Sequence, residues 1–233
     1  IVEVGAPDGL VFAFDKATGE VAWKGAKGGK FSYSSPALVG EGDGQRVAVF
    51  HAFGLGVFDL ADGREVWRYP WKTYDLCSVA TPIVMGNRIL ISSAYGRGAA
   101  LLEIGKDKPV WFTRELMCHH ATCVLWKRHL YGFHGDRRDP GELRCLDVAT
   151  GKVKWSQGGM GKGTVLLAGG RLLVLSQKGE LLAADASPDG FKPLARARVL
   201  RGLCWTTPVL CKGRLYCRDL PGDLVCLDLR PPR

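Results

Sequence analysis

The chain repeats itself at a fixed interval, and this repeat limits the possible folds more than any other feature of the sequence. Four segments begin with an acidic residue and carry a tryptophan eight residues later: Asp15–Trp23, Asp59–Trp67, Glu103–Trp111 and Asp147–Trp155. The four acidic residues lie 44 positions apart in three consecutive steps, and weaker copies follow at Asp185 and Asp228. A period of this length is typical of an array of similar units, in which each unit buries its apolar face against the next.

A second motif keeps the same interval and opens the units. It is a Ser-Pro or Thr-Pro step before a short apolar run, and two variants lack the proline: Ser35-Pro36, Thr81-Pro82, Thr207-Pro208, Ala121-Thr122 and Gly163-Thr164. Between the two motifs lie further short apolar runs, which are separated by glycine-containing turns. Each unit therefore reads as four short antiparallel strands, the pattern of a β-propeller blade.

The acidic residue and the glycine of each repeat suit a tight turn between the third and fourth strands. An aspartate side chain can accept hydrogen bonds from the backbone just after it, and glycine tolerates a positive φ. The tryptophan lies on the fourth strand, where its ring can cover the edge of a neighbouring blade. We expect these structural roles for Asp15, Gly19, Trp23, Asp59, Gly63, Trp67, Trp111, Asp147, Gly151 and Trp155.

The strand pattern predicts an all-β chain with about six blades in one propeller domain over residues 1–233. Residues 1–33 supply three strands and lack the first strand of a blade. Residues 204–233 supply three strands and lack the last one. Four complete blades are expected between them, over residues 34–79, 80–118, 119–162 and 163–203.

Composition supports this interpretation and excludes several classes of function. Glycine accounts for 31 of the 233 residues and proline for 12, which is typical of a chain with many turns. The formal net charge is +9, but lysine and arginine are scattered, so no nucleic-acid-binding surface is indicated. No run of 18 apolar residues is present, so we expect no transmembrane segment. None of the 8 cysteines forms a C-x-x-C motif, which indicates no zinc site and leaves the disulfide state open.

The phrase A-F-D-K-A-T-G-E-V-A-W, from Ala13 to Trp23, resembles the repeat of the PQQ-type (quinoprotein alcohol dehydrogenase-like) β-propellers. The resemblance covers nearly the whole chain, which is most similar to secreted bacterial propellers with PQQ-like repeats. Because that family usually closes eight blades, the resemblance implies an open C-terminal portion of an eight-bladed ring, with a complete six-bladed ring as the alternative. It also implies a periplasmic or secreted location, although the chain begins at Ile1 without a signal peptide.

The same resemblance implies what a PQQ enzyme would need. Such dehydrogenases place a pair of adjacent cysteines over the quinone and hold Ca²⁺ with a glutamate, an asparagine and a nearby aspartate. The chain has no adjacent cysteines, and its one asparagine, Asn87, lies in an expected turn, which leaves Trp205 as a possible aromatic floor. We therefore predict no catalytic residue, no metal site and no assured cofactor. A PQQ- and calcium-dependent oxidoreductase acting on an alcohol or sugar is kept as the alternative function.

Loops at one end of the blades supply the candidate ligand-binding residues. Most of them lie in the loops between consecutive blades, and one lies between the second and third strands of its blade: Tyr33, Asp75, His119, His120, Trp205 and Thr206, with Arg97 in the second kind of loop. These loops are expected at one mouth of the channel, where a pocket with a few polar groups is the default hypothesis for a ligand site.

The histidines allow both a functional and a structural interpretation. Adjacent residues on a strand point to opposite faces, so we expect at most one of His119 and His120 to face a given site. The alternative is one packed and one solvent-exposed histidine. His51 and His134 end second strands at matching places, where they either line one rim or are hydrated loop residues.

Strong scaffold motifs without the cofactor ligands predict a non-catalytic platform that binds a protein partner or a small ligand at one propeller face. In this respect the chain resembles the outer-membrane assembly lipoproteins of bacteria, which share the repeat and present loops to partner proteins. Exposed apolar or aromatic residues on the loops would favour this function over the oxidoreductase.

Overall fold

The structure is a computed structural model that describes residues 1–28, 30–42 and 44–230, and all its regular elements are strands. The strands form six antiparallel sheets in two compact units, residues 1–114 and 115–233. Within the described residues, no helix has the length and hydropathy needed to cross a membrane. The prediction of an all-β chain is confirmed.

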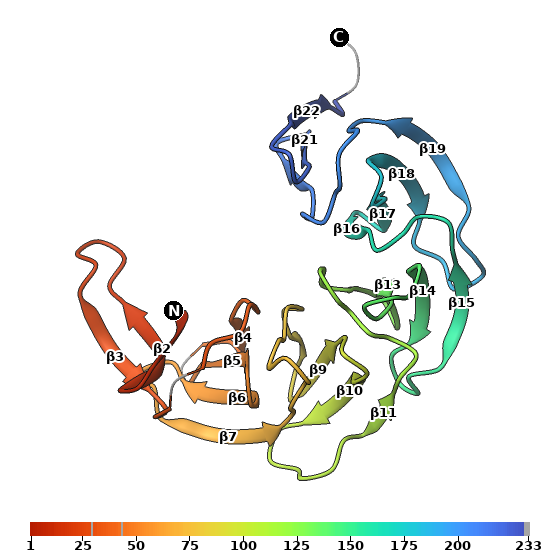
Figure 1. The fold of residues 1–233 in the computed structure, drawn as a ribbon. Helices are drawn as coiled ribbons and strands as arrows, with labels where there is room; N and C mark the ends of the chain where they lie inside the picture. The colour runs from red at the N-terminus through yellow and green to blue at the C-terminus, as the bar shows by residue number, and fades with distance from the viewer. Residues whose placement is uncertain (29, 43, 231–233) are drawn as a thin grey trace. The chain divides into compact units, whose positions relative to one another are not determined.

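The first unit contains one three-stranded sheet and two four-stranded sheets (Figure 1). The three-stranded sheet consists of β1 (Val2–Ala6), β2 (Gly9–Phe14) and β3 (Val21–Gly25). The next consists of β4 (Ala37–Val39), β5 (Arg46–His51), β6 (Gly54–Asp59) and β7 (Glu65–Pro70). The last consists of β8 (Ile83–Met85), β9 (Arg88–Ser93), β10 (Gly98–Glu103) and β11 (Trp111–Thr113).

The second unit contains two four-stranded sheets and one three-stranded sheet. The first consists of β12 (Val124–Trp126), β13 (His129–His134), β14 (Glu142–Asp147) and β15 (Val153–Gln157). The next consists of β16 (Thr164–Ala168), β17 (Arg171–Leu175), β18 (Glu180–Asp185) and β19 (Pro193–Arg198). The last consists of β20 (Val209–Cys211), β21 (Arg214–Arg218) and β22 (Leu224–Asp228).

Within every sheet the strands follow chain order, so each pairs with its neighbour in sequence, as expected of propeller blades. The middle strands carry the core. Phe50 and Leu55 of one sheet pack with Ile91 and Leu102 of the next, and in the second unit Tyr131 belongs to a cluster that extends into β17 and β18. That the sheets form one domain with the expected blade limits stays a prediction, and residues 231–233 of the last range lie outside the described residues.

The turn between the third and fourth strands forms as the repeat suggests. The Oδ1 atom of Asp15 accepts hydrogen bonds from the amides of Ala17 and Thr18, at 2.8 and 2.9 Å. Asp147 repeats this arrangement, and Asp59 accepts one such bond from Ala61. The glycine four residues after each of these aspartates has a positive φ: 76° at Gly19, 74° at Gly63 and 69° at Gly151. A residue with a Cβ atom would be strained there.

The repeat tryptophans join neighbouring sheets. The indole N–H of Trp23 donates a hydrogen bond of 2.9 Å to the carbonyl of Leu60, which follows β6 in the next sheet. Trp155 donates in the same way to the carbonyl of Ser187, also at 2.9 Å. The Trp23 ring also lies against Gly63, where an added Cβ atom would be only 2.3 Å away from it. Each contact therefore combines apolar burial with one satisfied polar group. The other two, Trp67 and Trp111, lie half-buried on the outer strands β7 and β11.

Candidate functional site

In the second unit, two inter-sheet loops bring three aromatic rings into one stack. His119 and His120 lie in the loop before β12, and Trp205 lies in the loop before β20. The rings of His119 and His120 are 3.9 Å apart between centroids, and the His120 ring stacks on the indole of Trp205 at 4.1 Å and 22°. The expectation that the two histidines point to opposite faces is wrong, because both residues lie in a bend rather than on a strand.

Burial keeps both imidazoles of this stack neutral at pH 7. It lowers the pKa of His120 to about 4, with smaller contributions from the charges of His119 and Lys162. Burial also lowers the pKa of His119, and Lys162 adds to the effect. The indole N–H of Trp205 is buried and has no hydrogen-bond partner among the described residues. The stack is therefore a flat, uncharged surface with one unsatisfied donor, beside a lysine that the repeat pattern does not single out.

Backbone contacts fix the loops around the stack. The Lys162 ammonium donates to the carbonyl of Arg137 at 3.0 Å, and the Lys162 amide donates to Oε1 of Gln177 at 2.8 Å. The Thr164 hydroxyl donates to the carbonyl of Thr206 at 3.5 Å. Of the candidate residues, His119, His120, Trp205 and Thr206 thus lie in one group of loops.

Tyr33, Asp75 and Arg97 lie in the first unit, and there Arg97 contacts a tryptophan that sequence reasoning missed. Its guanidinium lies 4.5 Å from the ring centroid of Trp71, and the Trp71 indole donates to the hydroxyl of Ser93 at 2.8 Å. Trp71 is 1% exposed, so this cation–π contact is largely removed from water. A signal for Trp71 was present in the sequence, because it follows the repeat tryptophan Trp67 by four residues and falls outside the period.

Three exposed aromatic side chains lie on two joined loops of the first unit. The backbone amide of Tyr33 donates to the carbonyl of Ser78 at 3.0 Å, which joins the loop after β3 to the loop after β7. Tyr33 is 67% exposed, Phe31 contacts it edge-on and is 59% exposed, and Tyr74 on the second loop is 84% exposed. Asp75 is exposed beside Tyr74. We call Phe31, Tyr33 and Tyr74 the aromatic loop patch; only Tyr33 of these was a sequence candidate.

The last residue of the second strand, or the one just after it, is polar in five sheets. These polar residues are His51, Ser93, His134, Ser176 and Asp219. Each lies five positions after the residue that pairs, across the sheet, with the acidic residue of the repeat. Ser93, His134 and Asp219 accept hydrogen bonds from the loop that enters their sheet, namely from the Trp71 indole and the amides of Met117 and Gly202. His51 is fully buried and accepts the Phe53 amide instead, at 3.2 Å. His51 is therefore a buried structural residue rather than a hydrated loop residue, and His134 holds a loop in place.

The described residues do not fit a calcium-bound quinone. No three His, Cys, Asp or Glu side chains gather in this part of the chain closely enough to hold a metal ion. Asn87 lies in the turn between β8 and β9, at the opposite end of its sheet from the candidate loops. One face of the Trp205 indole is covered by His120.

Comparison with known proteins confirms the repeat and the fold. The family model PQQ_2, described as outer membrane protein assembly factor BamB, matches residues 1–157 and 141–228. A comparison with curated proteins finds no match. The prediction of PQQ-type repeats is confirmed.

Among solved structures, BamB from Moraxella catarrhalis is similar with a TM-score of 0.68 and 17% identity; the match covers 92% of this chain and 65% of that one. The computationally designed Ika8 protein gives a TM-score of 0.71 at 13% identity, with 97% of this chain and 67% of that one covered. The designed Ika4 protein gives 0.53 at 13% identity, with 73% and 100% covered. At these identities the likeness shows the fold alone, and the prediction of a β-propeller is confirmed.

Proposed function

This chain belongs to the family described as outer membrane protein assembly factor BamB, and on that premise we propose that it is a non-catalytic platform for a protein partner. The partner docks on the aromatic loop patch, Phe31, Tyr33 and Tyr74. We place the platform in the periplasm or outside the cell, in keeping with the outer membrane in the family's description. The chain spans 65% of the length of the BamB structure that it matches.

The proposal rests on the exposure of the aromatic loop patch. Phe31, Tyr33 and Tyr74 are all exposed on the two joined loops, and exposed aromatic side chains are enriched among the residues that dominate the binding energy of protein interfaces. The hydrogen bonds of Tyr33 and Ser32 to Ser78 hold the two loops together, so little conformational entropy is lost when a partner binds. Lys30, Lys72 and Asp75 are exposed on the same two loops, so cations outnumber carboxylates there, which favours a partner with acidic residues around an apolar centre.

Site-specific photocrosslinking tests the proposal. A photoreactive phenylalanine analogue replaces Tyr74 in the protein expressed in its own cells, and a second variant carries the analogue at Val110. Val110 is 43% exposed and lies just before β11, at the opposite end of its sheet from the inter-sheet loops. We expect one discrete crosslinked protein from position 74 and none from position 110. Equal crosslinking at both positions, or none at either, would contradict the proposal.

A double substitution then measures how much the patch contributes. Tyr33→Ser with Tyr74→Ser removes two exposed rings, so the fold should be retained. Tyrosine is enriched among the few interface residues whose truncation costs about 2 kcal/mol or more, so we expect the affinity for the crosslinked protein to fall by at least about tenfold. Val110→Ser is the matched control and should leave this affinity unchanged.

A further inference from the structure

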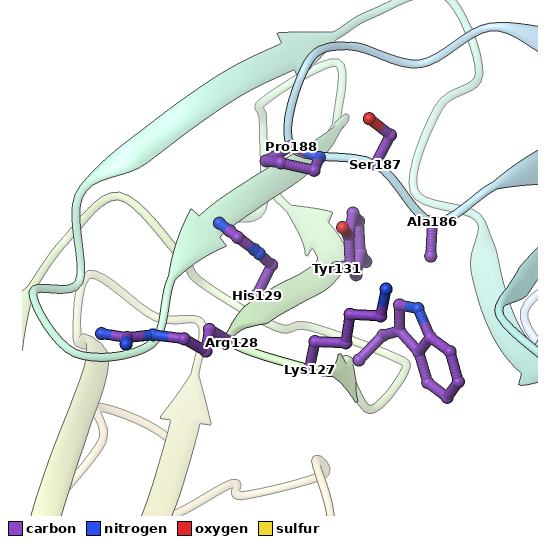
Figure 2. A pocket seen from close by; sticks show the side chains of 8 residues that line it. Lys127, Arg128, His129, Tyr131, Ala186, Ser187 and Pro188 are labelled. Atoms are coloured by element: carbon purple, nitrogen blue, oxygen red, sulfur yellow. The ribbon is translucent and has the colours of Figure 1, made fainter.

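A pocket of about 450 Å³ lies between two neighbouring sheets of the second unit, at the end opposite the His119–Trp205 stack. One wall is the hairpin of β12 and β13, which contributes Trp126, Lys127 and Tyr131; the other is the segment after β18, with Ala186 and Pro188 (Figure 2). Its volume is in the range of small-ligand sites, and its walls are mostly aromatic and aliphatic. A flat apolar group fits between such walls.

The pocket carries one positive charge that the protein itself does not neutralise. Lys127 occupies the hairpin turn with a φ of 54°, and its ammonium lies 6.0 Å from the ring centroid of Trp126. Figure 2 shows its side chain directed toward Ala186, whereas Arg128 is directed away. Within the part of the chain that the structure describes, Lys127 forms no ion pair and no carboxylate lines the pocket.

Two carboxylates, Asp147 and Asp189, act on residues of this pocket without lining it. Asp147 accepts hydrogen bonds from the Thr150 hydroxyl and from two backbone amides, and Arg128 adds a favourable charge next to it. Asp189 accepts the hydroxyl proton of Ser187 at 3.3 Å. These hydrogen bonds leave both carboxylates charged, but neither carboxylate lines the pocket, whereas Lys127 does. The lining itself therefore attracts an anion.

A buried tyrosine also lines the pocket. Tyr131 is 0% exposed, and its hydroxyl forms a hydrogen bond with the thiol of Cys145. Figure 2 shows Tyr131 between His129 and Ala186, among the residues that line the pocket. Its ring therefore adds apolar wall, and its hydroxyl is satisfied within the protein.

We propose that this pocket binds a small aromatic carboxylate. Its ring packs between the Trp126 and Pro188 walls, and its carboxylate pairs with the Lys127 ammonium. This site is independent of the aromatic loop patch, which lies in the other unit, so either proposal can fail without the other.

The test uses benzoate as the anionic probe and benzamide as its neutral counterpart. Each is titrated to about 20 mM into the whole chain while the indole N–H resonances and backbone amides are followed by NMR. We expect saturable shifts at the Trp126 indole and at Lys127 with benzoate, at least about tenfold weaker binding of benzamide, and weaker benzoate binding as salt is raised.

Lys127→Met and Lys212→Met form a matched pair of variants. Both lysines lie in the turn between the first and second strands of a sheet, with φ values of 54° and 49°, but Lys212 does not line the pocket. Lys127→Met should weaken benzoate binding at least about tenfold, and Lys212→Met should not change it. The absence of saturable shifts, or equal binding by both variants, overturns the proposal.

Discussion

At the scale of the residue, Gly63 meets two separate requirements. Its φ of 74° is a conformation that residues with a Cβ atom rarely adopt, and the Trp23 ring of the preceding sheet occupies the space a Cβ atom would need. Gly19 occupies the same turn of its own sheet with a φ of 76°, but nothing lies within 4 Å of its ideal Cβ position. The two glycines thus separate the backbone requirement from the packing requirement.

Alanine substitutions at these two glycines should lower the free energy of unfolding by different amounts. We expect Gly19→Ala to lower the free energy of unfolding by about 1 kcal/mol, the strain of the left-handed conformation. Gly63→Ala should lower it by about 3 kcal/mol, because Trp23 must also move. Urea denaturation of the two variants measures the difference, and equal losses would show that the Trp23 contact adds nothing.

A single buried histidine should make stability depend on pH. Burial lowers the pKa of His51 from 6.5 to about 4, with Arg68 contributing further. The unfolded chain therefore binds a proton at a higher pH than the folded chain, so stability is complete above about pH 6.5 and falls as the pH drops toward 4. We expect this group to remove about 2 kcal/mol of stability at about pH 5.

His51→Asn keeps an acceptor for the Phe53 amide and removes the titrating group. Between about pH 7 and pH 5, the free energy of unfolding of this variant should fall by about 2 kcal/mol less than that of the unsubstituted chain. The slope of the unfolding free energy against pH is compared, rather than its value at one pH, since the substitution also changes packing. Parallel slopes would refute this role of His51.

At the scale of the element, the second strand has a role at both of its ends in three of the sheets. Its first residue pairs with the repeat acid, and this residue is basic in most sheets, as in Arg88 opposite Glu103 and Arg171 opposite Asp185. At its other end, a polar residue such as Ser93, His134 or Asp219 holds the loop that enters the sheet. The second strand thus fixes the place of loops that have no regular structure of their own.

Asp219 gives the most direct test of this role. Its carboxylate is 1% exposed and accepts the amides of Gly202, Gly222 and Asp223 at 2.9 to 3.1 Å. Asp219→Asn replaces one acceptor oxygen with a donor, so we expect a loss of about 2 kcal/mol in unfolding free energy and faster hydrogen exchange at the Gly202 amide. Asp223→Asn, at an exposed neighbouring position, should change stability by less than about 0.5 kcal/mol. An unchanged Gly202 exchange rate would contradict the assignment.

The strands were predictable from the sequence because the repeat encodes them. The acid, glycine and tryptophan recur with one period, so each copy supports the interpretation of the others, and the observed strands follow it. The loops carry no period. Nothing local in the sequence indicates that His119 and His120 lie in a bend, that His120 stacks on Trp205, or that Trp71 lies beneath Arg97. These contacts join residues from different loops, and their geometry depends on tertiary packing.

At the scale of the whole molecule, the repeat supplies a scaffold and the loops supply its individual surfaces. The family resemblance extends over nearly all of the chain, yet the described residues lack a donor set for a calcium-bound quinone. Exposed aromatic residues are gathered instead on loops of the first unit. The propeller architecture therefore does not by itself define the chemistry of its loops.

Calorimetric titration of PQQ into the whole protein, with and without Ca²⁺, tests whether the cofactor binds. We expect no heat beyond dilution, because the described carboxylates and imidazoles do not converge on a metal and His120 covers a face of Trp205. Saturable, calcium-dependent binding near one equivalent would contradict the expectation and favour an oxidoreductase.

The contact between a tryptophan and the following sheet has a consequence for how such chains evolve. Trp23 and its partner Leu60 come from consecutive repeats, as do Trp155 and Ser187. These two repeats donate to their successors, a head-to-tail arrangement that further copies can extend. Duplicating one unit of the gene adds a junction of a kind already present. The two hydrogen bonds span different lengths of chain, 37 residues from Trp23 to Leu60 and 32 residues from Trp155 to Ser187. The tryptophan thus fixes the contact between two sheets and leaves the length of the segment between them free to vary.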